Sequence, residues 1–597
     1  MENNELMTNK RHTLAHLLAA AVLELYPDTK NTIGPAVDNG FYYDFEFSSP
    51  LSENDLIKIE TKMREILPTW GAFSHTEISA TEAKTKYTDN SYKLELIEEI
   101  ATKGETITLY TAGEPAEHQS GVSGAGFTDL CRGGHVENPS TDIDPAGFKL
   151  DRLAGAYWRG DSNNKMLTRI YGLAFDNQEE LEDFIAKRDE AEKRDHRKLG
   201  KELDLFVFSE VVGKGLPLYT ERGATIRREL ERFIVDEEIR RGYLHVLNPD
   251  IARLDLYKKS GHYPHYKDSM YAPIVIDDEE FMLRPMTCPH HFELYLSKPH
   301  SYRELPMRIA EVAKLYRYEQ SGELSGLIRV RSFCLADAHI ICADEEQAVA
   351  EISGALDLIE YVTGTFGLKL NEHYSYRLSL GNRTDTEKYY KNDAAWDKGE
   401  ALLRQMLEKR GTSFVEAENE AAFYGPKIDI QMKNVNGKED TAFTVQYDFC
   451  MPDRFDLAYV DKDGSTKRAI VVHRSSIGAL ERIMAFLIEH YAGAFPTWLS
   501  PVQVAVLPVA EAHDEFAKNI FDQLKEAGLR VEFLESGDSL GKRIRNVKMS
   551  KTPYFIVIGD KEKDSGNITI ENRAGDKEEI STEKFIEKIH TEIKNRS

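Results

Sequence analysis

The sequence has few cysteines and no long uninterrupted run of apolar residues. Its five cysteines are an odd number, lie far apart and include no C-x-x-C pair, which disfavours a disulfide framework and leaves metal binding or nucleophilic catalysis as their special roles. The longest apolar stretches, such as 485–495 with Glu489 and His490 inside it, fall short of the roughly 18 residues that a membrane span needs. Residues 1–5 are acidic and polar and lack the basic start of a signal peptide. We therefore expect a cytoplasmic protein with no membrane partner.

The sequence also has fewer basic than acidic residues. The 597 residues include 76 lysines and arginines against 101 acidic residues, which gives a formal net charge of −25. An acidic surface repels the phosphates of a nucleic acid, so this balance argues weakly against such a partner, although it leaves room for a local basic patch. At roughly 150 residues per domain, the length predicts about three or four domains.

Two features divide the chain. A dense charged run with few apolar residues covers 177–202 and predicts a solvated connecting helix between two domains. Two prolines in the segment 496–501 mark a second boundary. We therefore expect a mixed helix-and-strand domain over 1–176, a large central domain over 203–498, and a third domain over 499–597.

The third domain alternates clearly between strand and helix. Apolar strands are predicted at 502–509, 529–534 and 554–558, with helices at 510–527 and 539–550 between them. Such alternation predicts a small α/β domain with parallel strands and right-handed crossovers. The second helix carries four basic residues, for which a solvated face and an RNA contact are equally good interpretations: Lys542, Arg543, Arg545 and Lys548.

A hairpin carries the densest set of functional side chains in the central domain. Two strand-like runs between Pro306 and Ile341 flank the loop 320–326. Alternation along the second run places six residues on one face: Arg329, Arg331, Phe333, Leu335, Asp337 and His339. Arg317 and Glu319 share a face of the first run. A charge-decorated exposed hairpin would look similar, but charges on a central sheet favour a ligand cleft, and arginines suit a triphosphate.

Two shorter segments are less specific on their own. An apolar strand over 469–472 ends at His473, and Ser475 or Ser476 is predicted to cap the helix that follows. In that helix Gly478 and Arg482 would share a face, so that a flat ligand could approach the glycine and stack on the arginine. The segment 284–291 contains Cys288 beside two histidines, a combination that is more often inert than metal-binding.

Together these segments resemble the class II aminoacyl-tRNA synthetases. Arg317-Tyr-Glu319 with Arg329-Val-Arg331-Ser-Phe333 is similar to motif 2, Gly478-Ala-Leu-Glu-Arg482 to motif 3, and Pro249 lies where motif 1 has its proline. Arg284-Pro-Met-Thr-Cys288-Pro, Asp337-Ala-His339 and Val472-His473-Arg474 resemble the zinc-holding segments of threonyl-tRNA synthetases. The resemblance begins at Arg11 and keeps the same order along the chain.

The resemblance implies a multidomain α+β and α/β fold. Its parts would be an α+β editing domain, an antiparallel-sheet catalytic domain and a C-terminal α/β anticodon-binding domain. It implies the substrates ATP, L-threonine and tRNA(Thr), Mg²⁺ with ATP, and a homodimer formed through the motif 1 region. Some members carry a further small domain before the editing domain, and we expect it to be absent because Arg11 already opens the editing motif.

The resemblance also assigns roles in the central site. One zinc ion would be held by Cys288, His339 and His473, leaving a fourth position open for substrate. Threonine offers that position an amino and a hydroxyl group, whereas valine has the same shape without the hydroxyl. The remaining assignments are Asp337, Tyr424, Gln446 and Arg317 for threonine, Arg317, Glu319, Arg329, Arg482 and Gly478 for ATP, and Lys427 and His262 in support.

The chain departs from the family pattern at several of these places. Relatives often have lysine, asparagine and glycine where this sequence has Arg284, Thr287 and His290. Leu335 and Thr441 stand where glutamines are usual, and these two positions bear on substrate contacts.

A second polar set lies near the amino terminus. Leu14, Leu17, Leu18, Ala21, Val22 and Leu25 form an amphipathic helical stripe. His12 and His16 lie off that stripe, one turn apart, and Cys131 and His135 repeat the same spacing. Two such pairs make a plausible zinc set, with solvated histidines and a turn cysteine as the alternative.

This segment resembles the editing domain of bacterial threonyl-tRNA synthetases and its relative in alanyl-tRNA synthetases, the latter zinc-holding. Serine keeps the hydroxyl and is smaller than threonine, so a second, hydrolytic pocket is needed to remove it. In the threonyl family the pocket implied is metal-free, with six residues that would position water and the tRNA end: His12, His16, Lys93, Asp129, Cys131 and His135. In the anticodon-binding domain, Glu562 and Arg573 are the candidate base-contacting residues, and Glu571 replaces a usually basic position.

Two other functions remain open from the sequence. One is another class II specificity, such as proline or serine, which would share motifs 2 and 3 without the cysteine–histidine set. The other is a synthetase-like RNA-binding regulator without catalysis, against which the retained Arg317, Arg329 and Arg482 argue.

Overall fold

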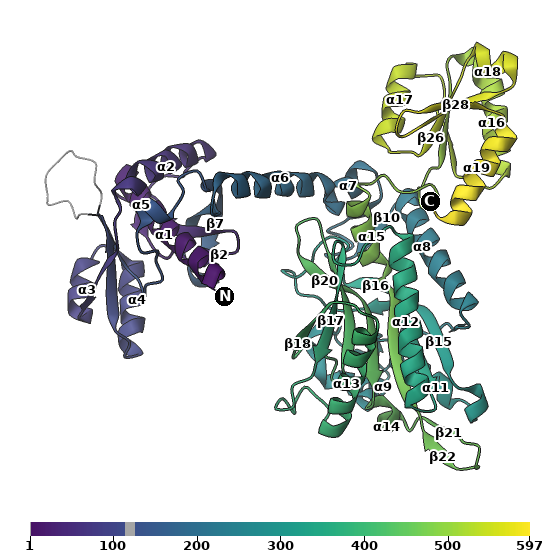
Figure 1. The fold of residues 1–597 in the computed structure, drawn as a ribbon, viewed down its shortest axis with the longest axis horizontal. Coiled ribbons are helices and arrows are strands. Elements are labelled where there is room, and N and C mark those ends of the chain that lie inside the picture. Colours follow the sequence, from purple (N-terminus) through teal and green to yellow (C-terminus); the bar gives the residue numbers. More distant parts are fainter. Residues whose placement is uncertain (1, 114–125) are drawn as a thin grey trace. The chain divides into compact units, whose positions relative to one another are not determined.

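The structure is a computed structural model that describes residues 2–113 and 126–597. The chain divides into two compact units, Met1–Asp189 and Glu190–Ser597 (Figure 1). Each unit has its own sheets and its own buried core. No helix among the described residues is long and apolar enough to cross a membrane.

The first unit is built on an antiparallel sheet with the strand order β1-β3-β8-β7, on which β2 pairs with β3. Helix α1 (Glu2–Leu25) packs on β3 and on α2 (Glu53–Ile66). Its predicted apolar stripe is buried except for Leu25 at the helix end, and neighbouring alanines are buried too because α1 is covered on two sides. The strands are β1 (Lys30–Asn31), β2 (Ala36–Val37), β3 (Gly40–Glu46), β7 (Phe148–Tyr157) and β8 (Met166–Ala174).

A smaller antiparallel sheet, β4-β5-β6, completes the first unit. It is formed by β4 (Ser74–Ile78), β5 (Ile107–Ala112) and β6 (Phe127–Leu130). The associated helices are α3 (Ala80–Lys86), α4 (Ser91–Thr102) and α5 (Pro139–Asp142). Lys93 therefore comes from α4 and Asp129 from β6, which brings together residues that are distant in sequence.

The predicted connecting helix is two helices. Helix α6 (Gln178–Arg194) is mostly exposed, as its charged composition predicts. Asp195 then interrupts it and caps α7 (His196–Glu202) by accepting a hydrogen bond from the backbone N–H of Arg197. The new helix is not solvated throughout, because His196 and Leu199 are buried in the second unit.

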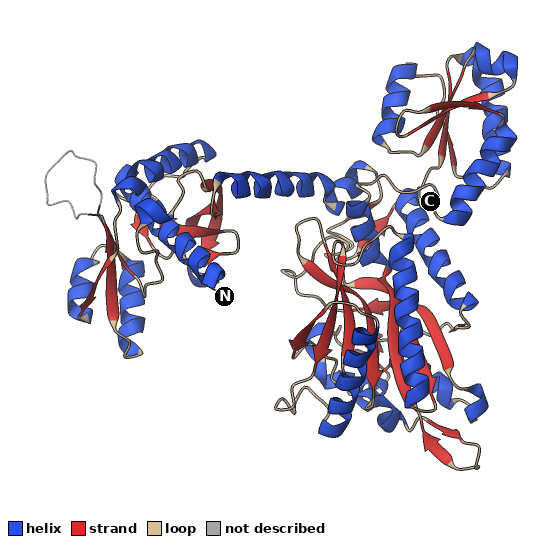
Figure 2. Ribbon diagram, in the orientation of Figure 1, coloured by secondary structure: helices blue, strands red, loops and turns tan. Residues whose placement is uncertain are grey.

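The second unit contains an eight-stranded sheet with the order β11-β15-β16-β23-β20-β19-β17-β18. Its pairs are antiparallel except at the two edges, where β11 and β18 run parallel to their neighbours, so the expected antiparallel catalytic sheet is confirmed. Helix α12 (Glu345–Thr365) packs along β23, β20 and β16, as Figure 2 shows by its course over the strands. The strands are β11 (Leu244–His245), β15 (Met307–Tyr316), β16 (Ser332–Cys342), β17 (Tyr374–Leu380), β18 (Phe414–Glu418), β19 (Lys427–Lys433), β20 (Glu439–Asp448) and β23 (Ile470–Ala479).

The predicted hairpin is present, but its strands are shorter than expected. Strand β15 ends at Tyr316 and β16 begins at Ser332, so Arg317, Glu319, Arg329 and Arg331 lie in the connection rather than on paired strands. Asp337 and His339 remain on one face of β16, as alternation requires.

The prediction of a helix starting after Ser475 or Ser476 is wrong. Strand β23 continues to Ala479, and α15 (Leu480–His490) begins one residue later without a side-chain cap. The strand extends because β23 lies in the middle of the sheet, paired with β16 on one side and β20 on the other, and its interior residues are all buried. Gly478 is therefore a strand residue, and it does not share a helix face with Arg482.

The carboxy-terminal sheet has the order β25-β24-β26-β27-β28. The strand–helix alternation correctly predicts that β24, β25 and β26 are parallel, while β27 and β28 add an antiparallel edge. The elements are β24 (Val504–Pro508), α16 (Asp514–Glu526), β25 (Val531–Phe533), α17 (Leu540–Met549), β26 (Tyr554–Ile558), α18 (Asp560–Ser565), β27 (Ile568–Asn572), β28 (Lys577–Ile580) and α19 (Thr582–Asn595).

The remaining elements of the second unit surround the eight-stranded sheet. The strands are β9 (Phe206–Phe208), β10 (Pro217–Tyr219), β12 (Ile251–Arg253), β13 (Ile274–Ile276), β14 (Glu279–Leu283), β21 (Ala458–Val460) and β22 (Thr466–Arg468). The helices are α8 (Glu221–Arg240), α9 (Leu254–Ser260), α10 (His262–His265), α11 (Cys288–Leu296), α13 (Asp393–Lys409) and α14 (Met451–Phe455).

Candidate active site

One row of paired residues crosses the centre of the eight-stranded sheet. His339 on β16 pairs with His473 on β23, which pairs with Gln446 on β20, which pairs with Lys427 on β19. Side chains at paired positions of a sheet project from the same face, so these four residues face the same space. The rings of His339 and His473 meet edge to face, with their centroids 4.6 Å apart.

Cys288 joins this row from a different element. It is the first residue of α11 and is buried. Ligand atoms of Cys288, His339 and His473 all lie within 4.8 Å of one another. The structure therefore brings together the three residues that the sequence marked as zinc ligands.

Each histidine of this set has a further buried partner. Nε2 of His473 is 2.6 Å from Oδ2 of Asp448, and the ring of Tyr424 stacks on His473 at 4.8 Å between centroids. Nδ1 of His339 is 2.8 Å from Nδ1 of His291.

The contact to His291 continues to a carboxylate. Nε2 of His291 lies 3.3 Å from Oε2 of Glu311, an interior residue of β15. Asp448 and Glu311 were not identified from the sequence, although both occupy buried strand positions, where a charged residue needs a partner.

The protonation of this set fits a metal site. Burial lowers the pKa of His339 well below its ordinary value, which keeps the imidazole neutral, as a ligand must be. Burial also raises the pKa of the Cys288 thiol, so thiolate formation needs a positive charge, which zinc would supply while displacing the proton. Two imidazoles and one thiol, with a carboxylate behind His473, are a donor set that would suit zinc.

A cavity of about 610 Å³ opens in front of this row. Among the residues assigned from the sequence, it is lined by Cys288, Asp337, His339, His473, Tyr424, Gln446, Lys427, Arg317, Glu319, Arg329 and Arg482. Leu335 and Thr441, which replace the family's glutamines, line it as well. The hydroxyl of Tyr424 donates to Oε1 of Gln446 at 2.5 Å, which fixes the orientation of that amide.

The arginines of the cavity are held by backbone carbonyls and rings. Nε of Arg317 is 3.4 Å from the carbonyl oxygen of Pro285, and its guanidinium lies over the ring of Phe333 at 5.2 Å. Nε of Arg482 donates to the carbonyl oxygen of Ile328 at 2.9 Å. Among the described residues neither Arg317 nor Arg482 forms an ion pair, so both remain available to an anionic ligand. Arg329 differs, because its Nη1 lies 3.9 Å from Oε1 of Glu323.

Two assigned residues lie beside the cavity wall rather than on it. Gly478 has φ of +70°, and a Cβ there would come within 2.1 Å of the carbonyl oxygen of Ala442 on β20, so the glycine is required by the neighbouring strand. His262 is buried, with Nε2 3.8 Å from Sγ of Cys288 and Nδ1 2.8 Å from Oγ of Ser260.

The amino-terminal residues also form one cluster. Ligand atoms of His12, His16, Cys131 and His135 lie within 4.8 Å of one another, although α1 supplies two of them and the segment after β6 the others. Sγ of Cys131 is 3.6 Å from Nε2 of His12 and 3.3 Å from Nε2 of His135. His16 is buried, so the alternative of two solvated histidines is wrong. Its Nδ1 has no hydrogen-bond partner among the described residues.

Burial dominates the protonation of this cluster. It lowers the pKa of His135 to about 2 and raises the pKa of the Cys131 thiol to about 11. Beside the cluster, Nζ of Lys93 and Oδ1 of Asp129 form a buried ion pair at 2.5 Å. Tyr43, to which the sequence assigned no role, donates its hydroxyl to Oδ2 of Asp129 at 2.5 Å.

The two residues assigned to the anticodon domain make contacts within the second unit. Glu562 is buried, and its oxygens accept from the hydroxyl of Thr569 at 2.7 Å and the N–H of Gly559 at 3.1 Å. Arg573 donates from Nη1 to the carbonyl oxygen of Ala494 at 3.1 Å.

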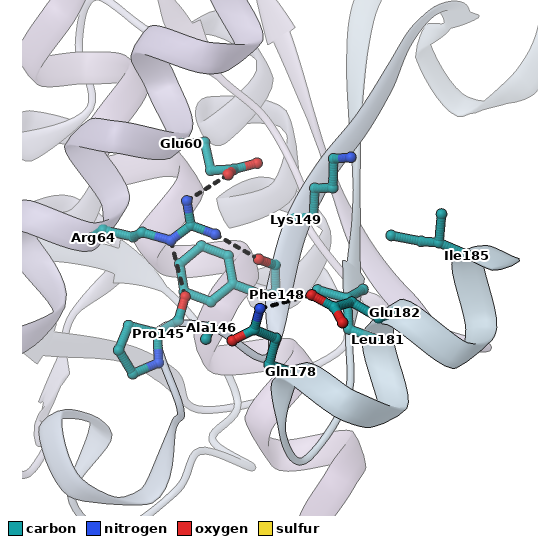
Figure 3. A pocket seen from close by; sticks show the side chains of 10 residues that line it. All are labelled: Glu60, Arg64, Pro145, Ala146, Phe148, Lys149, Gln178, Leu181, Glu182 and Ile185. Atoms are coloured by element: carbon teal, nitrogen blue, oxygen red, sulfur yellow. Dashed lines mark hydrogen bonds and ion pairs between the residues drawn. The ribbon is translucent and has the colours of Figure 1, made fainter.

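A further hollow of about 460 Å³ lies in the first unit between α2, the segment 145–149 and the start of α6 (Figure 3). Arg64 lines this hollow and donates to the carbonyl oxygens of Pro145 at 2.9 Å and Phe148 at 3.0 Å. Its remaining guanidinium nitrogen contacts Glu60 at 2.6 Å. The described residues that line the hollow include no histidine or cysteine, so it offers neither of the donor sets described above.

Comparisons with known proteins identify the family of the chain. The family model of the tRNA synthetase class II core domain (G, H, P, S and T) matches residues 271–491, and that of the anticodon binding domain matches residues 503–592. The chain is 47% identical over 588 residues to the threonine--tRNA ligase of Geobacillus sp. (strain WCH70), which covers 98% of this chain and 88% of that protein. It is 46% identical over 595 residues to the threonine--tRNA ligase of Staphylococcus carnosus (strain TM300), with 99% and 89% covered.

A solved structure shows the same relationship. The structure described as the RNA binding domain of threonyl-tRNA synthetase from Cryptosporidium parvum Iowa II superposes with a TM-score of 0.63 at 34% identity, covering 66% of this chain and 98% of that chain. The similarity to these bacterial relatives extends over nearly the whole sequence, and each of them is named as a threonine--tRNA ligase. This shared specificity argues against the alternative of a class II synthetase for another amino acid. The chain therefore belongs to the threonyl-tRNA synthetase family of class II enzymes and is a threonine--tRNA ligase.

Proposed function

We propose that this ligase selects threonine at one zinc ion held by Cys288, His339 and His473, and binds ATP with Mg²⁺ in the arginine-lined part of the same cavity. The observation that carries the proposal is the set of residues that line this cavity. Three buried donors of the types that zinc prefers meet at the cavity, and Arg317, Arg329 and Arg482 also line it.

When bound, zinc would accept the amino and hydroxyl groups of threonine, a pair that valine cannot offer. Asp337 lies two residues before His339 on the same face of β16, and it would accept the hydrogen bond of the threonine hydroxyl. Burial raises the pKa of Asp337, because its position gives the charged carboxylate little solvation. Tyr424 and Gln446, already bonded to each other, would form the wall beside the substrate.

Each arginine of the cavity would bind a different group of threonine or ATP. Arg317 lies nearest the cysteine segment, through its contacts to Pro285 and Met286, and would bridge the threonine carboxylate and the α-phosphate. Arg329 would bind the γ-phosphate and Arg482 the adenine, with Glu319, Gly478, Lys427 and His262 in supporting positions. Attack of the carboxylate on the α-phosphate gives threonyl-adenylate and pyrophosphate. A hydroxyl of the 3′-terminal ribose of tRNA(Thr) then takes the acyl group, and AMP leaves.

A second activity is proposed for the first unit. Serine retains the hydroxyl that the catalytic site selects, and it is smaller than threonine, so binding alone cannot exclude it. We place hydrolysis of seryl-tRNA in the cluster His12, His16, Cys131 and His135, with Lys93 and Asp129 beside it. We propose that this reaction uses no metal. Nδ1 of His16, which has no hydrogen-bond partner among the described residues, would orient a water molecule.

The proposed domain limits follow the sequence boundaries. They are 1–176 for editing, 177–202 for the connection, 203–498 for catalysis and 499–597 for the anticodon, with Glu562 and Arg573 as candidate base contacts. We also propose a cytoplasmic homodimer. Apolar side chains near motif 1 and on β13 are exposed, among them Leu247 at 90% and Val275 at 68%, and a second copy of the chain would cover them.

The first test is threonine-dependent ATP–pyrophosphate exchange, with valine and serine alongside, before and after zinc removal by a chelator. We expect strong exchange with threonine, weaker exchange with serine and none with valine. Chelation should abolish exchange, and added zinc should restore it. Exchange that persists in protein shown to be free of zinc would overturn the proposed metal site while leaving the ligase activity intact.

A further inference from the structure

A buried histidine from the connecting segment contacts the ATP side of the cavity. His196 is the first residue of α7, and its side chain is 3% exposed. Nδ1 of His196 is 2.7 Å from Oε1 of Glu489, which belongs to the last turn of α15 and is 5% exposed. The pair thus joins the connecting segment to the helix that carries Arg482.

The other ring nitrogen contacts the motif 2 connection. The backbone N–H of Leu327 donates to Nε2 of His196 at 3.1 Å. Because Nε2 accepts this bond, the ring proton must be on Nδ1, where it is donated to the Glu489 carboxylate. The imidazole therefore bridges a fixed donor and a fixed acceptor. Without it the N–H of Leu327 would be buried and unpaired, and the Glu489 carboxylate would keep only the backbone N–H groups of His196 and Val435 as donors.

Helix α15 also contacts the segment 327–328 directly, through Arg482. Nε of Arg482 donates to the carbonyl oxygen of Ile328, the residue after Leu327, at 2.9 Å. Arg482 and Glu489 are about two turns apart on α15, so they lie on one face of the helix. The segment 327–328 lines the proposed ATP cavity and is attached to α15 at both ends of that face.

Both attachments also reach the β19–β20 hairpin. Arg482 donates from Nη1 to the carbonyl oxygen of Thr441, and Oε2 of Glu489 accepts from the backbone N–H of Val435 at 3.1 Å. Helix α15 therefore connects the segment 327–328 with the β19–β20 hairpin at two positions, Arg482 and Glu489.

The imidazole of His196 is in close contact with the backbone at Gly326. Gly326 has φ of +49°, and a Cβ built there would lie 2.1 Å from Nε2 of His196. The backbone of the motif 2 connection thus rests directly on the imidazole ring, and a smaller side chain at position 196 would leave it without support.

We propose that His196, oriented by Glu489, is a positioning residue for ATP that fixes the segment 326–328 against α15. It does not touch the nucleotide. It sets the place of Leu327 and Ile328, and through Ile328 the place of the Arg482 guanidinium. This inference rests on the proposed assignment of the arginine-lined cavity to ATP.

The test compares three variants of the full chain in threonine-dependent ATP–pyrophosphate exchange. His196→Ala removes the bridge, whereas His196→Gln offers an amide whose nitrogen and oxygen can replace the two ring nitrogens. Leu199→Ala is the matched control, because Leu199 is a buried residue of the same helix with no role in the bridge. The KM for ATP, the KM for threonine, kcat and the melting temperature are measured for each variant, and Arg482→Ala serves as a reference for the ATP site.

We expect His196→Ala to raise the KM for ATP about tenfold while the KM for threonine and kcat stay within about twofold. His196→Gln should recover most of the affinity for ATP, and Leu199→Ala should lower the melting temperature without this selective change. A KM for ATP that is unchanged in His196→Ala, or changed equally in Leu199→Ala, would overturn this inference alone. Absence of any ATP effect in Arg482→Ala would overturn the proposed ATP site and this inference with it.

Discussion

His339 and His473 are direct partners across β16 and β23, and their rings meet at an interplanar angle of 85°. The proposed zinc site is therefore a consequence of strand register. A slip of one residue would turn one of the two imidazoles to the opposite face of the sheet. Both strands lie in the interior of the eight-stranded sheet, where pairing on both sides prevents such a slip.

Asp448 is predicted to orient His473 as a metal ligand. The carboxylate accepts from Nε2, which leaves Nδ1 directed to the metal, and losing its charge weakens both the orientation and the basicity of the ring. We expect Asp448→Asn to bind zinc about 10–100-fold more weakly, measured by competition with a chelator and by the absorption of the cobalt-substituted protein. The control is Asp456→Asn, an exposed residue at a left-handed position that asparagine also tolerates. Equal zinc affinity in the two variants would show that Asp448 does not support the metal.

Gly478 is predicted to be irreplaceable for a steric reason. An alanine there would meet the carbonyl oxygen of Ala442 at 2.1 Å and keep a φ of +70°. We expect Gly478→Ala to lower the free energy of unfolding by more than about 1 kcal/mol and to raise the KM for ATP, because Thr441, which accepts from Arg482, adjoins the displaced strand residue.

The matched control for this change is Gly354→Ala on α12. A methyl group at Gly354 would meet no atom of the described residues within 4 Å outside the backbone of its own helix. Because position 354 is also helical, alanine there should stabilise the protein by about 0.5–1 kcal/mol. Urea denaturation of both variants decides the matter. Similar stabilities for the two would contradict the steric account of position 478.

Lys93 is predicted to act both in stability and in editing. Replacing it with methionine leaves Asp129 buried without its cation, which should cost about 3–5 kcal/mol in the free energy of unfolding. The double variant Lys93→Met with Asp129→Leu removes both charges and should recover most of that stability. Hydrolysis of seryl-tRNA should be lost in both variants, as measured by deacylation. A stable double variant that still hydrolyses seryl-tRNA would limit the pair to a structural role.

Glu481 is predicted to make stability depend on pH. Burial raises the pKa of this glutamate to about 7 from its ordinary value of 4.5. Between these two pH values the folded protein binds more protons than the unfolded chain, so stability falls as the pH rises through that window. Glu481→Gln should match the wild type near pH 5 and exceed its free energy of unfolding by about 3 kcal/mol at pH 8. The exposed residue Glu408, changed to glutamine, is the control, and parallel pH profiles for the two variants would contradict the prediction.

The sequence by itself determined the residue types of the site and the local faces they occupy. Alternation along β16 placed Asp337 and His339 on one face, and the spacing of the histidines on α1 and after β6 indicated a second cluster, because both patterns depend only on the period of a strand or a helix. The parallel strands of the carboxy-terminal sheet followed from the order of its elements.

Only the tertiary structure decided what those residues contact. Strand β23 runs through Gly478 because it lies between two partner strands, and nothing in the local sequence records that position in the sheet. The partners Asp448, Glu311 and His196 are distant in sequence from the residues they support, and their pairing depends on long-range packing. A buried charge or imidazole requires a partner, but the sequence does not say which one, because that choice is made by the fold that brings distant segments together.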